Sequence, residues 1–246
     1  MPLRLPRRIS ACLFDLDGVL TRTAELHAAA WKQMFDEYLS RRAAERGETL
    51  VPFDPVVDYD KYVDGRPRLD GTRQFLGARG VKLPEGNPDD PPGTATVYGL
   101  SNRKNDIVLA LMRERGVAVY PGSVRFLEAV RKDGLPTAVV SSSANTKQVL
   151  QAAGLDGKFD VVVDGLVAER EHLAGKPAPD TYLAAARGLG VEPPVGAVFE
   201  DAIAGVQAGR SGGFGLVVGV DRTGQADALA ANGADVVVTD LAEMIG

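Results

Sequence analysis

Two carboxylates stand two residues apart in the segment DLDGV, directly after the apolar run ACLF at 11–14. On a strand Asp15 and Asp17 would share one face, but a turn at Gly18 can aim them in different directions. One carboxylate could then attack an electrophile while the other transfers a proton. Two ionised carboxylates this close repel each other and require a cation nearby, and an oxygen-rich site of this kind suits Mg²⁺. On its own, the pattern fits a solvated Asp-Gly turn equally well.

Two later segments carry groups that suit phosphate. Ser141, Ser142 and Ser143 end or follow the apolar run 137–141, where hydroxyls and backbone N–H groups at a helix start can hold phosphate oxygens. A serine N-cap is the simpler explanation of that segment alone. In GKPAPD, a rigid turn explains the prolines and the aspartate but not Lys176. A fixed ammonium there would bind a transferring phosphate and offset the carboxylate charge.

An acidic pair, Glu200 and Asp201, follows the apolar run 195–199. Exposed acidic residues at the start of a helix are common. Two more acids at the sheet edge that carries Asp15 and Asp17 are better explained as metal ligands.

The elements that must position these groups alternate between strand and helix in the C-terminal half. Short and nearly continuous apolar strands separated by helices are typical of a parallel sheet covered on both faces. We therefore predict an α/β fold with a doubly wound, Rossmann-like parallel sheet, to which the run 11–14 also belongs. The predicted strands are 137–141, 160–163, 195–199, 215–218 and 235–238, and the predicted helices are 123–132, 145–153, 180–189, 202–211 and 225–231.

A helical module separates the first strand from the rest of this sheet. Helical patterns cover 24–38, 69–78 and 103–115, and irregular segments are expected at 49–60 and 82–93. We predict a core domain formed by 1–20 and 121–246, with a helical cap domain, 21–120, inserted after the first strand. Active sites in such sheets lie at the carboxyl ends of the strands, where an insert can cover them.

Composition narrows the class of protein. The chain of 246 residues is 45% hydrophobic and 25% charged, with a net charge of -5, so no broad basic surface for nucleic acid is expected. Its one cysteine, Cys12, excludes an internal disulfide. The basic start MPLRLPRRIS has no long apolar stretch behind it, which argues against a signal peptide or a membrane anchor. We expect a monomeric cytoplasmic enzyme that acts on a small molecule.

The four motifs DLDGV, the serine after the second strand, GKPAPD and FEDA resemble those of haloacid dehalogenase-like phosphotransferases, in the same order. The resemblance implies an aspartyl-phosphate formed on the first aspartate, with Mg²⁺ bridging that carboxylate and the phosphate. The implied roles are nucleophile for Asp15, general acid and base for Asp17, and phosphoryl binding for Ser141 and Lys176. Metal binding is implied for Asp15, the Asp17 carbonyl and Asp201, and Glu200 is implied to be either a further metal ligand or an acid close to the metal.

The inserted segment resembles the cap of the β-phosphoglucomutase-like subfamily. The run TRTAELH followed by Trp31 matches its hinge and first cap helix. The resemblance implies that Thr23 and His27 couple cap closure to the acid–base carboxylate, whereas Trp31 packs between cap helices. Without the motif, a histidine on an amphipathic helix is usually a surface or packing residue.

Two basic clusters of the cap resemble substrate-binding segments of that subfamily. In VDGRPR, Arg68 matches an arginine that grips the non-transferring phosphate, and NRKND makes Lys104 and Asn105 candidate substrate contacts. Either cluster would also suit a solvated helix end. In the core, the resemblance adds Ser142, Ser143 and Asn145 as substrate contacts.

The cap also departs from the subfamily pattern. Asp64 and Ala144 stand where the subfamily can carry lysine, and Arg66 replaces one of these charges in our interpretation. The segments 49–60 and 82–93 make the cap longer than usual. These differences leave the identity of the sugar open without affecting the phosphoryl chemistry.

The resemblance implies a mutase that interconverts β-glucose 1-phosphate and glucose 6-phosphate. A sugar-phosphate phosphatase is the nearest alternative, because admission of water to the same site would hydrolyse the aspartyl-phosphate. Cap groups such as Arg68 and Lys104 favour the mutase, which must bind its substrate in both orientations. A non-catalytic domain that binds sugar phosphates is a third hypothesis, but such a domain has no need for a nucleophile.

Overall fold

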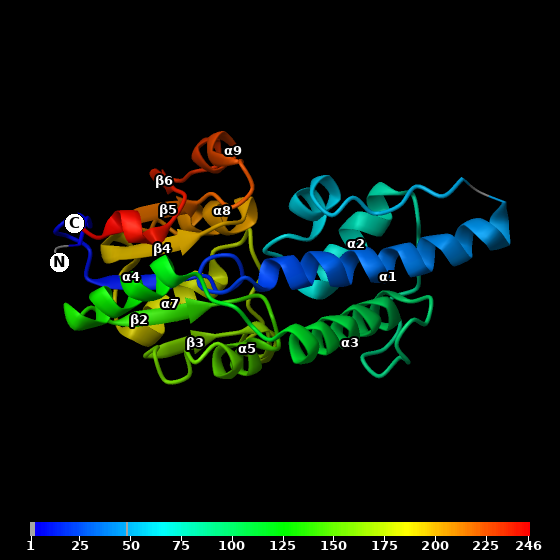
Figure 1. Ribbon diagram of the computed structural model, residues 1–246, viewed down its shortest axis with the longest axis horizontal. Coiled ribbons are helices and arrows are strands. Elements are labelled where there is room, and N and C mark those ends of the chain that lie inside the picture. Colours follow the sequence, from blue (N-terminus) through cyan, green and yellow to red (C-terminus); the bar gives the residue numbers. More distant parts are fainter. Residues whose placement is uncertain (1–2, 48) are drawn as a thin grey trace. The chain divides into compact units, whose positions relative to one another are not determined.

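The computed structural model describes residues 3–47 and 49–246. The chain folds into two units, one made of Met1–Arg22 together with Val117–Gly246 and the other of Thr23–Gly116. The first unit contains every strand that the described residues form, and the second is helical (Figure 1). Among the helices of the described residues, none has the length and apolar character needed to cross a membrane.

A six-stranded parallel sheet forms the centre of the first unit, in the order β3-β2-β1-β4-β5-β6. This is the doubly wound Rossmann order, so the predicted fold class is confirmed. On the central strand, Phe14 lies opposite Val139 of β2 and Phe199 of β4. The strands are β1 (Ala11–Phe14), β2 (Thr137–Val140), β3 (Val161–Val163), β4 (Gly196–Glu200), β5 (Leu216–Val220) and β6 (Val236–Val238).

Helices cover both faces of the sheet, and the side chains of β1 alternate between the two faces. Leu13 belongs to a buried cluster that includes Tyr182 of α7 and Val206 of α8. On the other face, the Phe14 ring stacks on Phe199 at 4.8 Å and meets Phe126 of α4 edge-on at 6.1 Å. The helices of this unit are α4 (Pro121–Lys132), α5 (Thr146–Ala152), α6 (Gly165–Arg170), α7 (Asp180–Leu189), α8 (Ile203–Ser211) and α9 (Ala226–Ala231).

Most boundaries differ from the predicted ones by one or two residues, and α6 was not predicted at all. This short helix depends on a cap rather than on an apolar pattern. The Asp164 carboxylate accepts a hydrogen bond from the Val167 backbone N–H at 2.8 Å, which satisfies one free donor of the first turn. The described residues also form a π-helix, Tyr59–Val63, and two 3₁₀ helices, Pro193–Val195 and Leu241–Met244.

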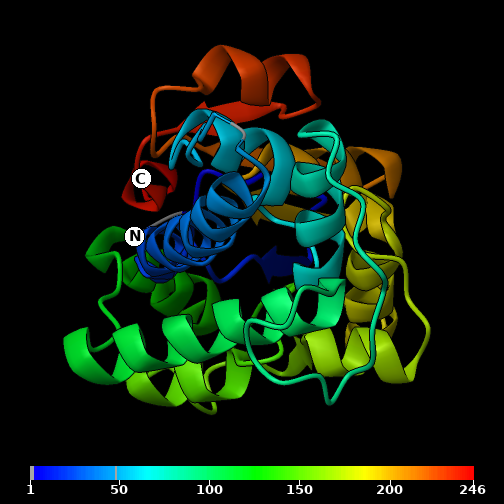
Figure 2. The ribbon, with the colours of Figure 1, turned by 90° about the vertical axis from the view of Figure 1, so that its right-hand side faces the viewer.

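The second unit is built on α1 (Thr23–Arg46), α2 (Arg68–Ala78) and α3 (Val97–Arg115). α1 and α3 run side by side (Figures 1 and 2). α3 begins six residues before the predicted start because Thr96 caps it, its Oγ1 accepting from the Gly99 N–H at 2.9 Å. The segment 49–60 was predicted to be irregular throughout, which is wrong at its end, where the π-helix Tyr59–Val63 begins.

Aromatic rings form the core of the helical unit. Phe35 is fully buried and its ring centroid lies 5.2 Å from Trp31, 5.3 Å from Phe53 and 4.1 Å from Phe75. As predicted, Trp31 therefore packs inside this unit. Aromatic contacts of this kind stabilise the core beyond the effect of the apolar area that the rings remove from water.

Replacing Phe35 with alanine should open a cavity at the centre of this cluster. We expect the free energy of unfolding of the helical unit to fall by about 3–5 kcal/mol. The single tryptophan, Trp31, stacks on Phe35 and makes its fluorescence a probe of this unit during urea unfolding. Val57→Ala, at a side chain that is 65% exposed, is the control and should change stability by less than about 0.5 kcal/mol. Equal stability of the two variants would contradict this account of the core.

Candidate active site

The parallel register brings the polar ends of three strands to one edge of the sheet. The Asp15 N–H donates to the Phe199 carbonyl at 2.9 Å, which extends the ladder between β1 and β4 by one residue. The Ser141 N–H donates to the Val163 carbonyl at 3.0 Å and extends the ladder between β2 and β3 in the same way. Glu200 ends β4 and Asp201 follows it. The groups expected at this edge from their sequence positions are therefore gathered there.

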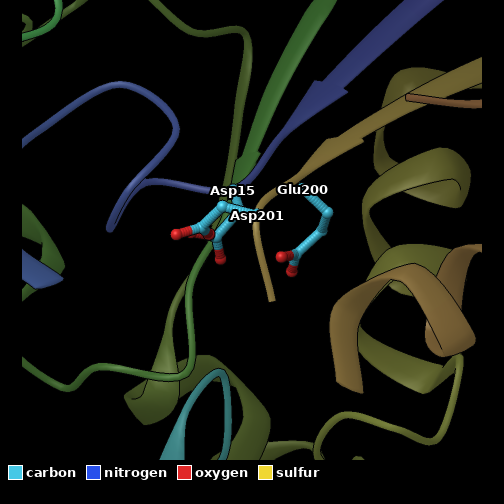
Figure 3. A group of neighbouring side chains, drawn as sticks. All are labelled: Asp15, Glu200 and Asp201. Atoms are coloured by element: carbon cyan, nitrogen blue, oxygen red, sulfur yellow. The ribbon is translucent and has the colours of Figure 1, made fainter. Parts of the chain in front are cut away.

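Three of these groups form a buried acidic cluster. Carboxylate oxygens of Asp15, Glu200 and Asp201 all lie within 4.8 Å of one another, and all three residues are buried. Figure 3 shows Asp15 and Asp201 side by side at the strand ends, with Glu200 next to them. Carboxylates packed this closely favour a hard divalent cation among them.

Lys176 supplies a positive charge inside this cluster. Its Nζ donates to Asp15 Oδ1 and to Glu200 Oε1, each at 2.5 Å, and to the Val140 carbonyl at 3.2 Å. Burial lowers the pKa of Lys176, but Asp15 and Glu200 outweigh burial, so this pKa lies well above its ordinary value and the amine stays charged. When all three carboxylates are ionised, one ammonium leaves two negative charges uncompensated, and a divalent cation would balance them.

Asp15 itself is in an environment that opposes its ionisation. Burial raises its pKa well above the ordinary value, and Glu200 and Asp17 add to the shift, while Lys176 acts in the opposite direction. Ionisation of Asp15 therefore depends on the positive charges around it. This requirement is a second reason why the donor set fits a bound cation.

Glu200 is held on both oxygens. In addition to Lys176, its Oε1 accepts from the Tyr182 hydroxyl at 3.1 Å, and its Oε2 accepts from the Ala202 N–H at 3.0 Å. A Cβ at Gly205 would stand 1.7 Å from Oε1, so a side chain at this position would displace the Glu200 carboxylate from its hydrogen bonds. Glu200 is therefore placed to fix Lys176 against Asp15.

Tyr182 is the residue of this network that the sequence interpretation missed. It is fully buried on α7, its ring centroid lies 4.9 Å from Lys176 Nζ, and burial together with Glu200 raises its pKa well above the ordinary value. In the sequence it reads as an ordinary core aromatic. Its position six residues after Lys176, in the helix opened by GKPAPD, was the one available signal.

The loop after β1 turns Asp17 toward Ser141. Asp17 Oδ2 accepts from Ser141 Oγ at 3.2 Å, while Gly18 adopts a left-handed φ of 88°. A Cβ at Gly18 would stand 1.7 Å from Asp201 Oδ2, so the loop must pass the acidic pair without a side chain there. As expected, the turn at Gly18 gives the two aspartates different surroundings, because Asp15 faces Lys176 and Asp17 faces Ser141.

The serine segment is organised by bonds from side chain to backbone. Ser141 Oγ accepts from the Ser143 N–H, and Ser143 Oγ accepts from the Asn145 N–H, each at 3.1 Å. Ser142 is half-buried and Asn145 is buried. These bonds fix the loop that starts α5, which is compatible with both the capping and the phosphate-binding interpretation.

The helical unit holds the remaining predicted residues. His27 of α1 lies 2.7 Å from Lys104 of α3, measured from Nδ1 to Nζ, and Lys104 is 4% exposed, with Nζ 5.0 Å from the Trp31 ring. The sequence interpretation named both residues without pairing them. The other three are Thr23, buried at the first position of α1, Arg68, half-buried at the first position of α2, and Asn105, half-buried on α3.

Replacing Lys176 with methionine should destabilise the first unit, because it leaves Asp15 and Glu200 buried without their counter-charge. We expect a loss of about 3–5 kcal/mol in the free energy of unfolding, measured by urea unfolding and circular dichroism. Lys147→Met, at an exposed lysine of α5, is the matched control and should differ from wild type by less than about 0.5 kcal/mol. A Lys176→Met variant as stable as this control would show that Lys176 does not serve as the counter-charge.

Known proteins are similar to this chain in both sequence and fold. The family model of haloacid dehalogenase-like hydrolases matches residues 9–213. A β-phosphoglucomutase of Mycobacterium tuberculosis (strain CDC 1551 / Oshkosh) is 58% identical, across 99% of this chain and 94% of that protein. A β-phosphoglucomutase of Bacillus subtilis is 31% identical, across 96% and 92%. The crystal structure of a β-phosphoglucomutase from Clostridium difficile superposes with a TM-score of 0.74 at 26% identity, covering 96% of this chain and 92% of that one.

Proposed function

This chain belongs to the haloacid dehalogenase-like hydrolase family, and we propose that it is a β-phosphoglucomutase that works through an aspartyl-phosphate on Asp15. The observation that carries the proposal is the 58% identity to a β-phosphoglucomutase over nearly the whole of both chains. The buried arrangement of Asp15, Lys176 and Asp201 supports it, because it supplies what phosphoryl transfer to a carboxylate requires.

The proposed reaction begins with phosphorylated Asp15. The 6-hydroxyl of β-glucose 1-phosphate attacks this phosphorus, the bond from the Asp15 oxygen to phosphorus breaks, and Asp17 takes the hydroxyl proton. The resulting glucose 1,6-bisphosphate turns round in the site. Asp15 then attacks the phosphorus at C1, the bond from phosphorus to the C1 oxygen breaks, and Asp17 returns its proton to that oxygen. Glucose 6-phosphate leaves and phosphorylated Asp15 is restored.

The charged groups near Asp15 have separate tasks in this proposal. Lys176 neutralises oxygens of the phosphoryl group during transfer, and the Ser141 hydroxyl, which donates to Asp17 in this structure, donates to the phosphoryl group instead when it is bound. Mg²⁺, held by Asp15, Glu200, Asp201 and the Asp17 carbonyl, would withdraw further negative charge from the phosphoryl oxygens.

We assign the phosphate that is not transferred to the remaining predicted residues. Arg68 can form a bidentate pair with a phosphate, and Lys104 adds a point charge. Thr23 and His27 are proposed to couple closure of the helical unit to Asp17. The other proposed substrate contacts are Asn105, Ser142, Ser143 and Asn145.

A phosphatase acting on a sugar phosphate is the second candidate. The observation that favours it is the matching family model, which describes hydrolases. The two reactions share the aspartyl-phosphate and differ in whether a sugar hydroxyl or water accepts the phosphoryl group. To propose a mutase is therefore to propose that a sugar hydroxyl, and not water, accepts the phosphoryl group from Asp15.

One assay separates the candidates. The protein is supplied with β-glucose 1-phosphate, Mg²⁺ and a trace of glucose 1,6-bisphosphate, and glucose 6-phosphate and free phosphate are measured. We expect glucose 6-phosphate as the main product and no turnover by Asp15→Asn, whose amide cannot form the aspartyl-phosphate. Free phosphate as the main product would favour the phosphatase. Absence of turnover with a panel of sugar phosphates would favour a binding domain, and substantial turnover by Asp15→Asn would refute the assigned nucleophile.

Mg²⁺ binding should strengthen as pH rises. Burial raises the pKa of Asp15 well above its ordinary value, so protons compete with the metal at lower pH and the Mg²⁺ dissociation constant should fall as the pH rises. Calorimetric titration with Mg²⁺ measures this constant. Asp201→Asn should raise it by at least about tenfold, whereas Asp227→Asn, at an exposed aspartate of α9, should leave it unchanged. A constant that does not change with pH, or an unaffected Asp201→Asn variant, would contradict the metal site.

A further inference from the structure

Arg222 lies behind the loop that carries Asp17, in the segment that follows β5. Its guanidinium donates from Nε to the Gly18 carbonyl at 2.8 Å and from Nη2 to the Val19 carbonyl at 3.3 Å. It also donates to the Thr239 carbonyl at 2.7 Å and to Ser123 Oγ at 3.3 Å. These four contacts occupy the planar fork of an arginine, and a lysine could not reproduce them.

The loop that Arg222 contacts is constrained from two sides. Gly18 presses against the carboxylate of Asp201, leaving no room for a Cβ, and its N–H donates to the Thr21 carbonyl at 2.7 Å. Arg222 holds the carbonyls of Gly18 and Val19. The position of the loop backbone that carries Asp17 therefore depends on Asp201 and on Arg222.

Arg222 also stacks on Tyr120, which pairs with the far end of the same loop. The guanidinium carbon lies 3.6 Å from the centre of the Tyr120 ring. The Tyr120 N–H donates to the Leu20 carbonyl at 2.9 Å, and Thr21 forms an antiparallel bridge with Val119. A single side chain thus connects the start and the end of the Asp17 loop.

The segment that carries Arg222 is itself fixed to the acidic end of the sheet. Asp221 Oδ1 accepts from the backbone N–H groups of Thr223, Gly224 and Gln225, which makes a tight turn. Gln225 Nε2 donates to the Asp201 carbonyl at 3.1 Å. Arg222 therefore projects from a turn that is tied to Asp201, and it can hold the Asp17 loop in register with the acidic cluster.

We propose that Arg222 is a positioning residue for proton transfer by Asp17, acting through the backbone carbonyls of Gly18 and Val19. The inference rests on the proposed aspartyl-phosphate chemistry. Proton transfer depends on hydrogen-bond geometry, and a displacement of about 1 Å can cost about 100-fold in rate. Asp15 lies on the end of β1 and is held by Lys176, so loss of Arg222 should affect the acid more than the nucleophile.

Two phosphoryl donors distinguish these effects. Glucose 1,6-bisphosphate phosphorylates Asp15 with a sugar hydroxyl as leaving group, which needs a proton from Asp17. Acetyl phosphate phosphorylates Asp15 with acetate as leaving group, which needs none. In rapid-quench measurements of phosphoenzyme formation, Arg222→Gln should slow transfer from the bisphosphate by about 10- to 100-fold and from acetyl phosphate by less than about threefold.

Two further variants control for folding and for charge. Arg210→Gln removes an exposed arginine of the same unit, paired with Asp235 at 3.2 Å, and should leave both rates unchanged. Arg222→Lys keeps the charge without the fork and should slow transfer from the bisphosphate selectively, to a smaller extent. It also serves as the test if Arg222→Gln does not fold.

An equal loss with both donors, or no loss with either, would overturn the role of Arg222. In both cases wild-type phosphoenzyme would still form, so the proposed function would stand. If wild type forms no phosphoenzyme with either donor, the proposed function fails and the inference fails with it.

Discussion

The ion pair network around Lys176 is the interaction on which the rest of the site depends. Its ammonium lies 2.5 Å from carboxylate oxygens of both Asp15 and Glu200 in a buried setting. Burying charges is costly, and the mutual attraction repays that cost only when the geometry is good and the remaining lone pairs are satisfied. The bonds from Tyr182 and from the Ala202 N–H to Glu200 provide this satisfaction. Asp15 can thus be kept at the sheet edge in a partly neutralised environment.

The parallel sheet explains why such a cluster can form at all. Because β1 lies between β2 and β4, groups that follow these strands meet at one edge although they are far apart in the sequence. Because they have no side chain, Gly18 and Gly205 let the backbone lie directly against the carboxylates of Asp201 and Glu200, respectively. Packing on the two faces, by Phe126 of α4 and by Tyr182 of α7, holds the strands at their places. Tyr182 contributes to both the core and the acidic cluster, because its ring packs in the core and its hydroxyl donates to Glu200.

The sequence predicts the elements whose signals are local and periodic. Short apolar strands and the helices between them were found to within a few residues, and the four motifs identified the family. The short helix α6 was not predicted because it depends on the Asp164 cap rather than on an apolar pattern. The early start of α3 was not predicted for a similar reason, since Thr96 caps it. Contacts across the chain are harder to predict. Tyr182 and Arg222 act on residues that lie close only after folding, and neither forms part of a recognisable motif. The pairing of His27 with Lys104 depends in the same way on the packing of α1 against α3.

The two aspartates of DLDGV differ in environment, and this difference matches the two roles proposed for them. Asp15 is buried, faces Lys176 and belongs to the cluster that can hold a cation, which suits a nucleophile that must be ionised. Asp17 is half-buried and accepts a hydrogen bond from Ser141, which leaves it better placed to exchange a proton. Acid and nucleophile are generally told apart by such contrasts of environment. Here the contrast is created within three residues, because the backbone leaves the sheet at Asp15, turns at Gly18 and is held there by Asp201 and Arg222.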